Sequence, residues 1–280
     1  MNNIFIVLII VSHLLRGLYS WLVKTIPTTL STQLLVRMLT FTLSAIMLGF
    51  SVGKNIISPS LTHLITMGAL NTVHILSSYY AYSQLPTTVS LPLFYLYPFI
   101  NVFLSSIFLQ NQITLSTIPW LLFSFIGAIL IVFQEGKISF SLKGIISILI
   151  AAFTESLIYI AFKSKYEPNE SQGLFNLYFG GLIAILIARA TNLIEPFDFN
   201  LEVWKPLLLF NFLVGFIALG IVIYSISKMS PELFASLAFF GVLSAYIFGE
   251  LGKEPKPSIP TILGSSMIAI GAAAVNYIKQ

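Results

Sequence analysis

The sequence predicts an all-α integral membrane protein with ten transmembrane helices arranged as two inverted five-helix repeats. The first observation is composition: 57% of the 280 residues are hydrophobic, mean hydropathy is +0.93, and 14 Lys and Arg plus 10 Asp and Glu make up only 9%. Soluble domains take about a quarter of their residues from these four types. The other two observations are a series of apolar windows and a polar stretch near mid-chain. At about 20 residues per span, ten crossings leave no room for a soluble domain.

The spans follow from apolar windows bounded by Pro, Gly, Asn and charged residues. The chain starts without a basic segment or a small-residue cleavage site, so the first window is expected to be a retained span rather than a removed signal peptide. The ten predicted spans are residues 4–23, 30–50, 60–82, 87–109, 114–133, 144–163, 173–194, 204–226, 231–250 and 258–278.

The polar stretch 134–143 divides the chain into a first repeat, 1–133, and a second repeat, 144–280. An offset of 139 places Arg16–Lys24 over Glu155–Lys163 and Gln33 over Gln172. Recurrence of segments in the same order is the sign of an internal repeat. Because five is an odd number of crossings, the second repeat must enter the membrane from the opposite side, which is the inverted architecture of many secondary transporters.

Several function classes are disfavoured. The net charge of +4 is spread over short loops, so nucleic acid is not expected as a partner. The absence of cysteine removes disulfides and thiolate chemistry. The chain has no Gly-x-Ser-x-Gly, His-Glu-x-x-His or Gly-x-x-x-x-Gly-Lys motif, so we expect no enzyme activity, no catalytic metal and no cofactor. A membrane enzyme acting on lipid and a non-transporting scaffold are the competing classes.

Ionisable side chains inside spans usually face the bundle interior. Arg16 lies eight residues before Lys24, and Glu155 lies eight residues before Lys163. Each is therefore about 12 Å deep, from opposite faces of a core about 30 Å thick, which leaves roughly 6 Å between them. We expect Arg16 and Glu155 to meet near the midplane. The alternative is that Arg16 extends to the interface and Glu155 makes a fixed structural hydrogen bond.

A polar stripe at helical spacing marks the second span and contains Arg37. Such a stripe on an apolar helix indicates a wetted or protein-facing side, and a guanidinium there would attract a carboxylate or phosphate. Extension of Arg37 to the interface is the alternative. The stripe consists of Gln33, Arg37, Thr40 and Ser44.

The third and fourth spans carry two further stripes that we expect to face a cavity. Their candidate binding or coupling residues are Asn71, His74, Tyr97 and Asn101, and His74 is a candidate for proton coupling. The alternative is that these groups bridge neighbouring helices. The stripes are His63, Met67, Asn71, His74, Ser78 and Tyr82 in the third span, and Ser90, Phe94, Tyr97, Asn101 and Ser105 in the fourth. Tyr79, Tyr80, Tyr95 and Tyr97 would suit a partly apolar solute.

Two other features have structural interpretations. Gly264 and Gly271 allow close helix approach, either within the bundle or in a homodimer. Glu250, at the end of the ninth span, is expected to cap or pair near the interface and not to bind substrate.

Several of these residues also resemble a known family. Gly17, Lys24 and Pro27 in and after the first span, Arg37 in the second, and the segment 230–236 leading to Phe248-Gly-Glu250 are similar to EamA-type transporters of the drug/metabolite transporter superfamily. The small residues of the fifth and tenth spans, Gly127-Ala-Ile-Leu and Gly271-Ala-Ala-Ala, fit the same pattern. The sequence departs from the family at Gln110, where Glu is frequent, and at Arg16, where an aromatic residue usually precedes the glycine.

The resemblance implies that spans one to four and six to nine surround a central cavity, with the fifth and tenth at the periphery. It also implies cytoplasmic termini and residence in the plasma or inner membrane. The expected function is a secondary transporter that moves a small polar or amphipathic metabolite by alternating access, with proton or exchange coupling and with lipid as its surroundings. A nucleotide-sugar or other phosphorylated-metabolite exchanger of the same superfamily is the alternative.

Overall fold

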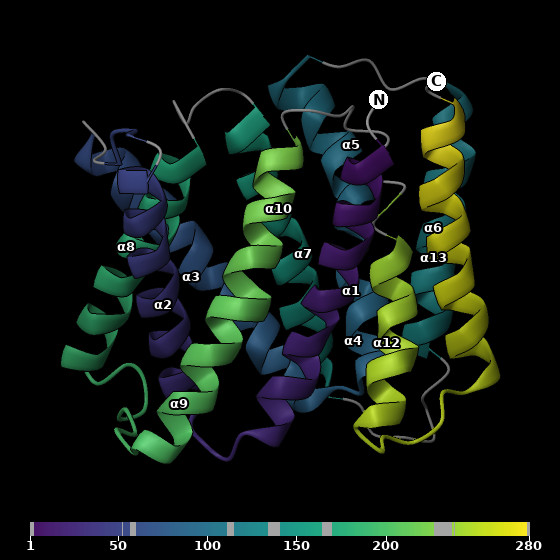
Figure 1. The fold of residues 1–280 in the computed structure, drawn as a ribbon. Helices are drawn as coiled ribbons and strands as arrows, with labels where there is room; N and C mark the ends of the chain where they lie inside the picture. Colours follow the sequence, from purple (N-terminus) through teal and green to yellow (C-terminus); the bar gives the residue numbers. More distant parts are fainter. Residues whose placement is uncertain are drawn as a thin grey trace.

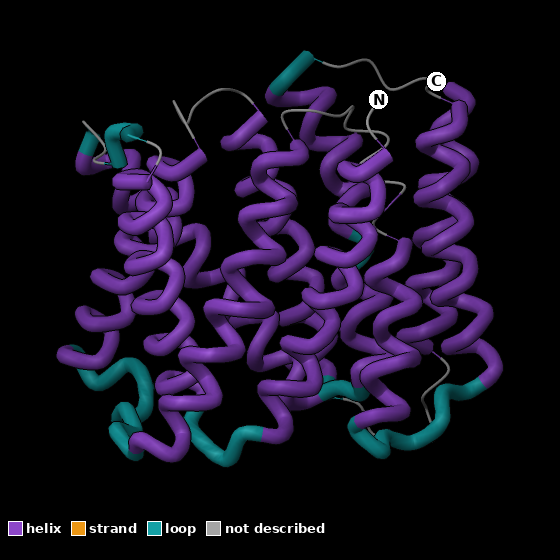
Figure 2. The backbone as a smooth tube through the Cα atoms, in the orientation of Figure 1, coloured by secondary structure: helices purple, strands orange, loops and turns teal. Residues whose placement is uncertain are grey.

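Ten helical rods make up the described part of the protein. The computed structural model describes residues 3–51, 53–56, 60–110, 115–133, 141–163, 170–226, 237 and 239–278. Over these residues the regular structure is entirely helical, and Figure 2 shows no strand among them. The predicted all-α class is therefore confirmed. The helices are α1 Asn3–Thr25, α2 Leu30–Ser51, α3 Leu61–Gln84, α4 Thr87–Phe94, α5 Tyr97–Phe108, η1 Leu115–Thr117, α6 Ile118–Phe133, α7 Leu142–Lys163, α8 Glu170–Ala190, α9 Leu201–Phe210, η2 Asn211–Phe216, α10 Ile217–Ile226, α12 Phe239–Leu251 and α13 Ile259–Ile278.

The rods match the ten predicted spans, with α4 and α5 forming the fourth and α9, η2 and α10 forming the eighth. They run up and down beside one another, and the two ends of the chain lie at the same side (Figure 1). The eighth rod begins at Leu201, three residues before its predicted start, because the side chain of Asn200 caps it by accepting a hydrogen bond from the Glu202 amide at 3.0 Å. Most of the connecting loop 134–143 and the segment 230–236 lie outside the described residues.

Six of the described helices are long and apolar enough to cross a membrane, and three shorter apolar helices accompany them. The protein is therefore an integral, multi-pass membrane protein. The 24-residue α3 is not among the six. Its stripe of buried polar groups lowers its hydropathy, and among them Asn71, His74 and Ser78 are each less than a tenth exposed. A helix of this kind is stable in lipid only where neighbouring helices cover its polar face.

The last rod of each half forms a pair at one edge of the bundle, where α6 packs against α13 (Figure 1). Two glycines allow this approach: a Cβ on Gly264 would lie 2.3 Å from the carbonyl oxygen of Gly127. Gly271 packs in the same way on Ser124. The small residues thus serve packing within the chain, and the peripheral position expected for the fifth and tenth spans is confirmed.

The remaining rods pack across the two halves. Helix α3 contacts both α7 and α8, α2 contacts α8, and α1 contacts α10 and α12. The centre of the bundle is therefore built from segments that are far apart in the sequence.

Two rods are interrupted near the centre. Between α4 and α5, Pro98 has no N–H to donate to the carbonyl of Phe94, and the chain turns at Tyr95 and Leu96. In the eighth rod, the π-helical segment η2 begins at Asn211, whose side-chain amide donates to the Leu207 carbonyl at 2.8 Å. Breaks of both kinds are frequent at functional sites of membrane helices.

Candidate functional site

A cavity of about 70 Å³ lies between the rods beside both interruptions. Its walls come from the first four rods and from the sixth, seventh and eighth. The expected contribution from the ninth span is not found among the described residues, because α12 packs on α1 and α4 away from the cavity. The polar and aromatic groups of the lining are Arg16, Tyr19, Arg37, Asn71, His74, Ser78, Tyr82, Phe94, Tyr95, Tyr97, Glu155, Tyr159, Phe162 and Tyr178.

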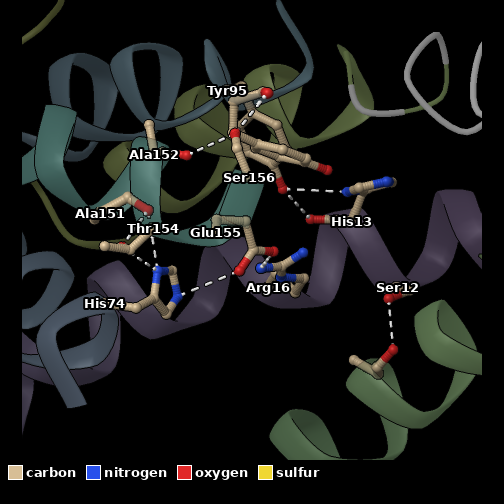
Figure 3. A network of polar contacts seen from close by, with 12 residues as sticks. Ser12, His13, Arg16, His74, Tyr95, Ala151, Ala152, Thr154, Glu155 and Ser156 are labelled. Atoms are coloured by element: carbon tan, nitrogen blue, oxygen red, sulfur yellow. Dashed lines mark hydrogen bonds and ion pairs between the residues drawn. The ribbon is translucent and has the colours of Figure 1, made fainter. Parts of the chain in front are cut away.

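Arg16 of α1 and Glu155 of α7 form an ion pair at this cavity (Figure 3). The distance from Arg16 Nη2 to Glu155 Oε1 is 2.5 Å, and the side chains are 15% and 16% exposed. The predicted meeting is therefore confirmed, and the alternative in which Arg16 extends to the interface is wrong. The other terminal nitrogen of Arg16, Nη1, is buried and has no hydrogen-bond partner in the part of the chain that the structure describes. The pair leaves one strong donor free for a ligand.

His74 of α3 touches the second oxygen of the same carboxylate. Its Nε2 lies 3.4 Å from Glu155 Oε2, and its Nδ1 lies 3.0 Å from the carbonyl oxygen of Ala151 (Figure 3). The ring of Phe94 packs on the other side, with ring centroids 6.0 Å apart. Arg16, Glu155 and His74 thus form a connected polar triad contributed by three different helices.

Arg37 of α2 lies in an aromatic cage. Its Nη1 donates to the hydroxyl of Tyr79 at 3.2 Å, and its guanidinium carbon lies 4.2 Å from the ring centroid of Tyr19 and 5.1 Å from that of Phe41. In the described part of the chain no carboxylate pairs with Arg37, and its Nε is buried without a hydrogen-bond partner. The prediction that Arg37 faces a cavity is confirmed. The cation–π contacts stabilise the cation without neutralising it.

The structure places the three remaining candidates, Asn71, Tyr97 and Asn101, in different surroundings. Asn71 lines the cavity and also donates to the Leu177 carbonyl of α8 at 3.2 Å, so it bridges helices as the alternative predicted. Tyr97 lines the cavity with a buried hydroxyl for which the described residues offer no hydrogen-bond partner. Asn101 is buried but is not part of the cavity wall. The stripe that included Asn101 assumed one continuous helix, and the interruption at Tyr95 and Leu96 changes the register beyond Tyr97.

Five aromatic residues at the site were not among the candidates: Tyr19, Tyr159, Phe162 and Tyr178 of the cavity lining, and Phe41, which contacts Arg37. Tyr19 follows Arg16 by three residues on α1, so helical spacing could have indicated it. Phe41 and Tyr178 meet across α2 and α8 with ring centroids 4.4 Å apart. No local pattern marks that contact, because it joins two helices in different halves of the chain.

A second polar cluster closes the end of the bundle where α1 ends. Lys24 pairs with Glu254, and Glu254 Oε2 accepts a hydrogen bond from the Thr87 amide at 2.6 Å. The Thr87 hydroxyl donates to Glu254 Oε1 at 2.7 Å and lies 2.7 Å from that of Ser20. We call Ser20, Lys24, Thr87 and Glu254 the clasp. The turn after α12 thus pairs through Glu254, whereas Glu250, for which capping or pairing was expected, is exposed.

The fold and the site define the class: a multi-pass α-helical membrane protein whose helices enclose a charged, aromatic-lined cavity. Residues 3–133 match the EamA-like transporter family. The match covers the first five rods and agrees there with the resemblance to EamA-type transporters.

Two individual proteins extend the comparison. A Bacillus subtilis (strain 168) protein named Uncharacterized transporter YdfC is 25% identical over 191 residues, which span 65% of this chain and 60% of that protein. A protein of known crystal structure is 13% identical and superposes with a TM-score of 0.70 over 99% of this chain and 98% of its own. At that identity the superposition establishes a shared fold.

Proposed function

We propose that the protein is a secondary transporter that moves a small polar or amphipathic metabolite carrying a carboxylate. One observation carries the proposal: three buried donors that have no partner among the described residues, Arg16 Nη1, Arg37 Nε and the hydroxyl of Tyr97, belong to side chains that line one cavity. Most buried donors in proteins have a hydrogen-bond partner. These three are therefore the groups to which a ligand would bind. The family match and the name of the Bacillus relative support a transport role.

Charge and size favour a carboxylate over a larger phosphorylated solute. Glu155 already neutralises Arg16, so Arg37 leaves the cavity lining with one uncompensated positive charge when His74 is neutral. A single carboxylate balances that charge, and Arg binds carboxylates through paired hydrogen bonds. The cavity of about 70 Å³ is well below the roughly 300–1,000 Å³ of pockets that take drug-sized ligands. A nucleotide-sugar would need both more volume and more cationic groups.

Transport by alternating access requires two halves that can move against each other. We propose that residues 1–133 and 144–280 are inverted repeats, and the pattern of contacts supports this. Helix α3, the third rod of the first half, contacts α7 and α8, the first two rods of the second half. The eighth rod, the third of the second half, contacts α1 and α2, the first two rods of the first half. Counterpart helices also contact each other directly in the pairs α2–α8, α6–α13 and α4–α12.

We propose that the clasp holds this end of the bundle closed and breaks when the cavity opens there. It joins the end of α1 to the start of α4 and to the turn after α12, so it holds elements of both halves together. Opening this end would break the Lys24–Glu254 pair and expose both groups to water, where ions are well solvated. Hydration of the two ions in the open state therefore offsets part of the cost of breaking the contact.

A ligand screen by thermal stabilisation tests the proposal, because a compound that binds the native state raises the melting temperature. The panel would contain monocarboxylates, amino acids, nucleotides, nucleotide-sugars and lipophilic cations. We expect stabilisation by small carboxylates and uptake of the same compounds into liposomes. Stabilisation by nucleotide-sugars alone would contradict the proposal. The variant Arg37→Met should remain folded but should no longer be stabilised by these carboxylates.

A further inference from the structure

We propose that His74 and Glu155 form a proton-binding site whose proton couples to substrate transport. The site lies between His74 Nε2 and Glu155 Oε2, which are 3.4 Å apart. The coupling part of the inference rests on the proposed transport function. The proton site itself rests on the geometry of the two side chains alone.

The hydrogen bonds at the other ring nitrogen determine where the proton must be. The carbonyl oxygen of Ala151, 3.0 Å from His74 Nδ1, can only accept, so Nδ1 carries a hydrogen. The Thr154 hydroxyl, 3.5 Å from Nδ1, donates to the Ile150 carbonyl at 2.8 Å and therefore cannot supply a competing donor. A neutral imidazole with its hydrogen on Nδ1 has only a lone pair on Nε2.

That lone pair points at a carboxylate oxygen, so the two groups repel unless a proton lies between them. When a proton from the aqueous phase binds, the contact becomes either an imidazolium–carboxylate pair or an imidazole hydrogen-bonded to a carboxylic acid. In both cases one proton is gained and no other bond changes. The second oxygen of Glu155 stays with Arg16, which fixes the carboxylate while the proton comes and goes.

The surroundings contain other charged and titratable groups that act on this site. Arg16 and Arg37 are cations, and their charge opposes proton binding, so an anion bound at Arg37 would favour it. Proton and substrate would then bind cooperatively, and the effect is reciprocal. The groups acting on the site are His13, Arg16 and Tyr19 from α1, Arg37 from α2, Tyr82 from α3 itself, Tyr95 and Tyr97 from the interrupted fourth rod, Tyr159 from α7 and Tyr178 from α8.

One proton moved with one monoanion carries no net charge. A transporter working in this way is driven by a pH gradient and is insensitive to membrane voltage. The same site would release its proton and its substrate together when the cavity opens on the other side.

The proton site can be tested without any substrate by nitrogen NMR on protein labelled at its histidine rings. The chain has three histidines, so His74 is assigned by its loss in His74→Gln. We expect its Nδ1 to stay protonated and its Nε2 to gain a proton as pH falls. In Glu155→Gln the pH at which Nε2 does so should be lower by about one to three units. His63, eleven residues away on α3, should not change and is the internal control.

Two results would overturn the proton site: an Nδ1 without hydrogen, or an Nε2 titration unaffected by Glu155→Gln. If Glu155→Gln does not fold, the number of protons that the protein takes up as the pH of an unbuffered solution is lowered replaces the NMR comparison. Wild type should take up one more proton than His74→Gln, and equal uptake would refute the site.

Coupling has its own experiment with the carboxylate found in the thermal screen. His74→Gln should lose accumulation driven by a pH gradient in liposomes and keep exchange of substrate for substrate. Gradient-driven accumulation by His74→Gln would refute the coupling. Since the NMR result does not depend on transport, failure of the proton site and failure of the proposed function are distinguishable.

Discussion

Arg16 Nη2 lies 2.5 Å from Glu155 Oε1, and the two residues are 139 positions apart, the offset that also places Gln33 over Gln172. In an inverted repeat, two equivalent positions can touch only near the axis that relates the halves. The pair would therefore mark the point about which the halves rearrange. It is also part of the cavity wall, which places a cation and an anion where the substrate is proposed to bind.

Breaking this pair from one side should destabilise the protein. Glu155→Gln leaves the Arg16 cation without its partner, and removing one member of a buried pair costs about 3–5 kcal/mol. The expected loss is smaller here, because both side chains keep about 15% exposure. The measurement is the melting temperature in detergent. The double variant Arg16→Met with Glu155→Met should melt above Glu155→Gln, and a double variant that melts below Glu155→Gln would contradict the assignment.

Arg37→Lys should weaken substrate binding while keeping the charge. Lysine lacks the planar fork and the Nε donor that is free in Arg37. Losing one charge-assisted hydrogen bond costs about 1.5–3 kcal/mol, or roughly a 10- to 150-fold drop in affinity. Binding of the carboxylate from the thermal screen measures the effect. Arg189→Lys is the control, because Arg189 is at the end of α8 and bonds to Asn192. Equal affinity of both variants would exclude Arg37 from the site.

Glu254→Gln should open the end of the bundle that the clasp closes. The chain has no cysteine, so a single Leu91→Cys on the cavity wall, one turn after Thr87, reports access by reaction with a polar thiol reagent. Weakening a charge-assisted contact by about 1.4 kcal/mol would raise the open population about tenfold. Glu250→Gln is exposed and lies in the same region, so it should leave the reaction rate unchanged. Identical rates in the two variants would show that the clasp is not a gate.

Gly264→Ala should destabilise the bundle without changing substrate affinity. The added methyl group would lie 2.3 Å from the Gly127 carbonyl oxygen, so α6 and α13 must separate. Neither helix contributes to the cavity wall. Gly220→Ala is the matched control, since a Cβ there would meet nothing within 4 Å and alanine favours a helix by about 0.5–1 kcal/mol. We expect a lower melting temperature for Gly264→Ala only, with unchanged ligand affinity.

Much of the fold could be predicted because hydropathy acts along the chain. Each helical rod overlaps a predicted span, and the early start of the eighth rod has a local cause, the Asn200 cap, which extends the helix through Glu202 and Lys205. Depth along a helix is also a property of sequence, since each residue adds about 1.5 Å. Equal distances of Arg16 and Glu155 from their span ends, together with the opposite orientation expected for the two halves, therefore predicted that they meet.

The site could be predicted only in part. Helical spacing identifies the residues that share one face of a helix, but not which other helices pack against that face. Arg37, His74 and Tyr97 were found on polar stripes, and Asn101 was placed wrongly because the fourth rod is broken before it. Glu254 and Thr87 carry no pattern that joins them across 167 positions.

The sequence by itself determined that the chain lives in a membrane, where its helical rods lie along the chain and which charges lie within them, since these depend on the local free energy of transfer into lipid. The tertiary structure alone decided which groups share a wall: the aromatic cage of Arg37, the contact of His74 with Glu155, and the clasp. Those arrangements depend on how the helices pack and where they break. Packing is determined by how well side chains from segments that are distant in the sequence fit together.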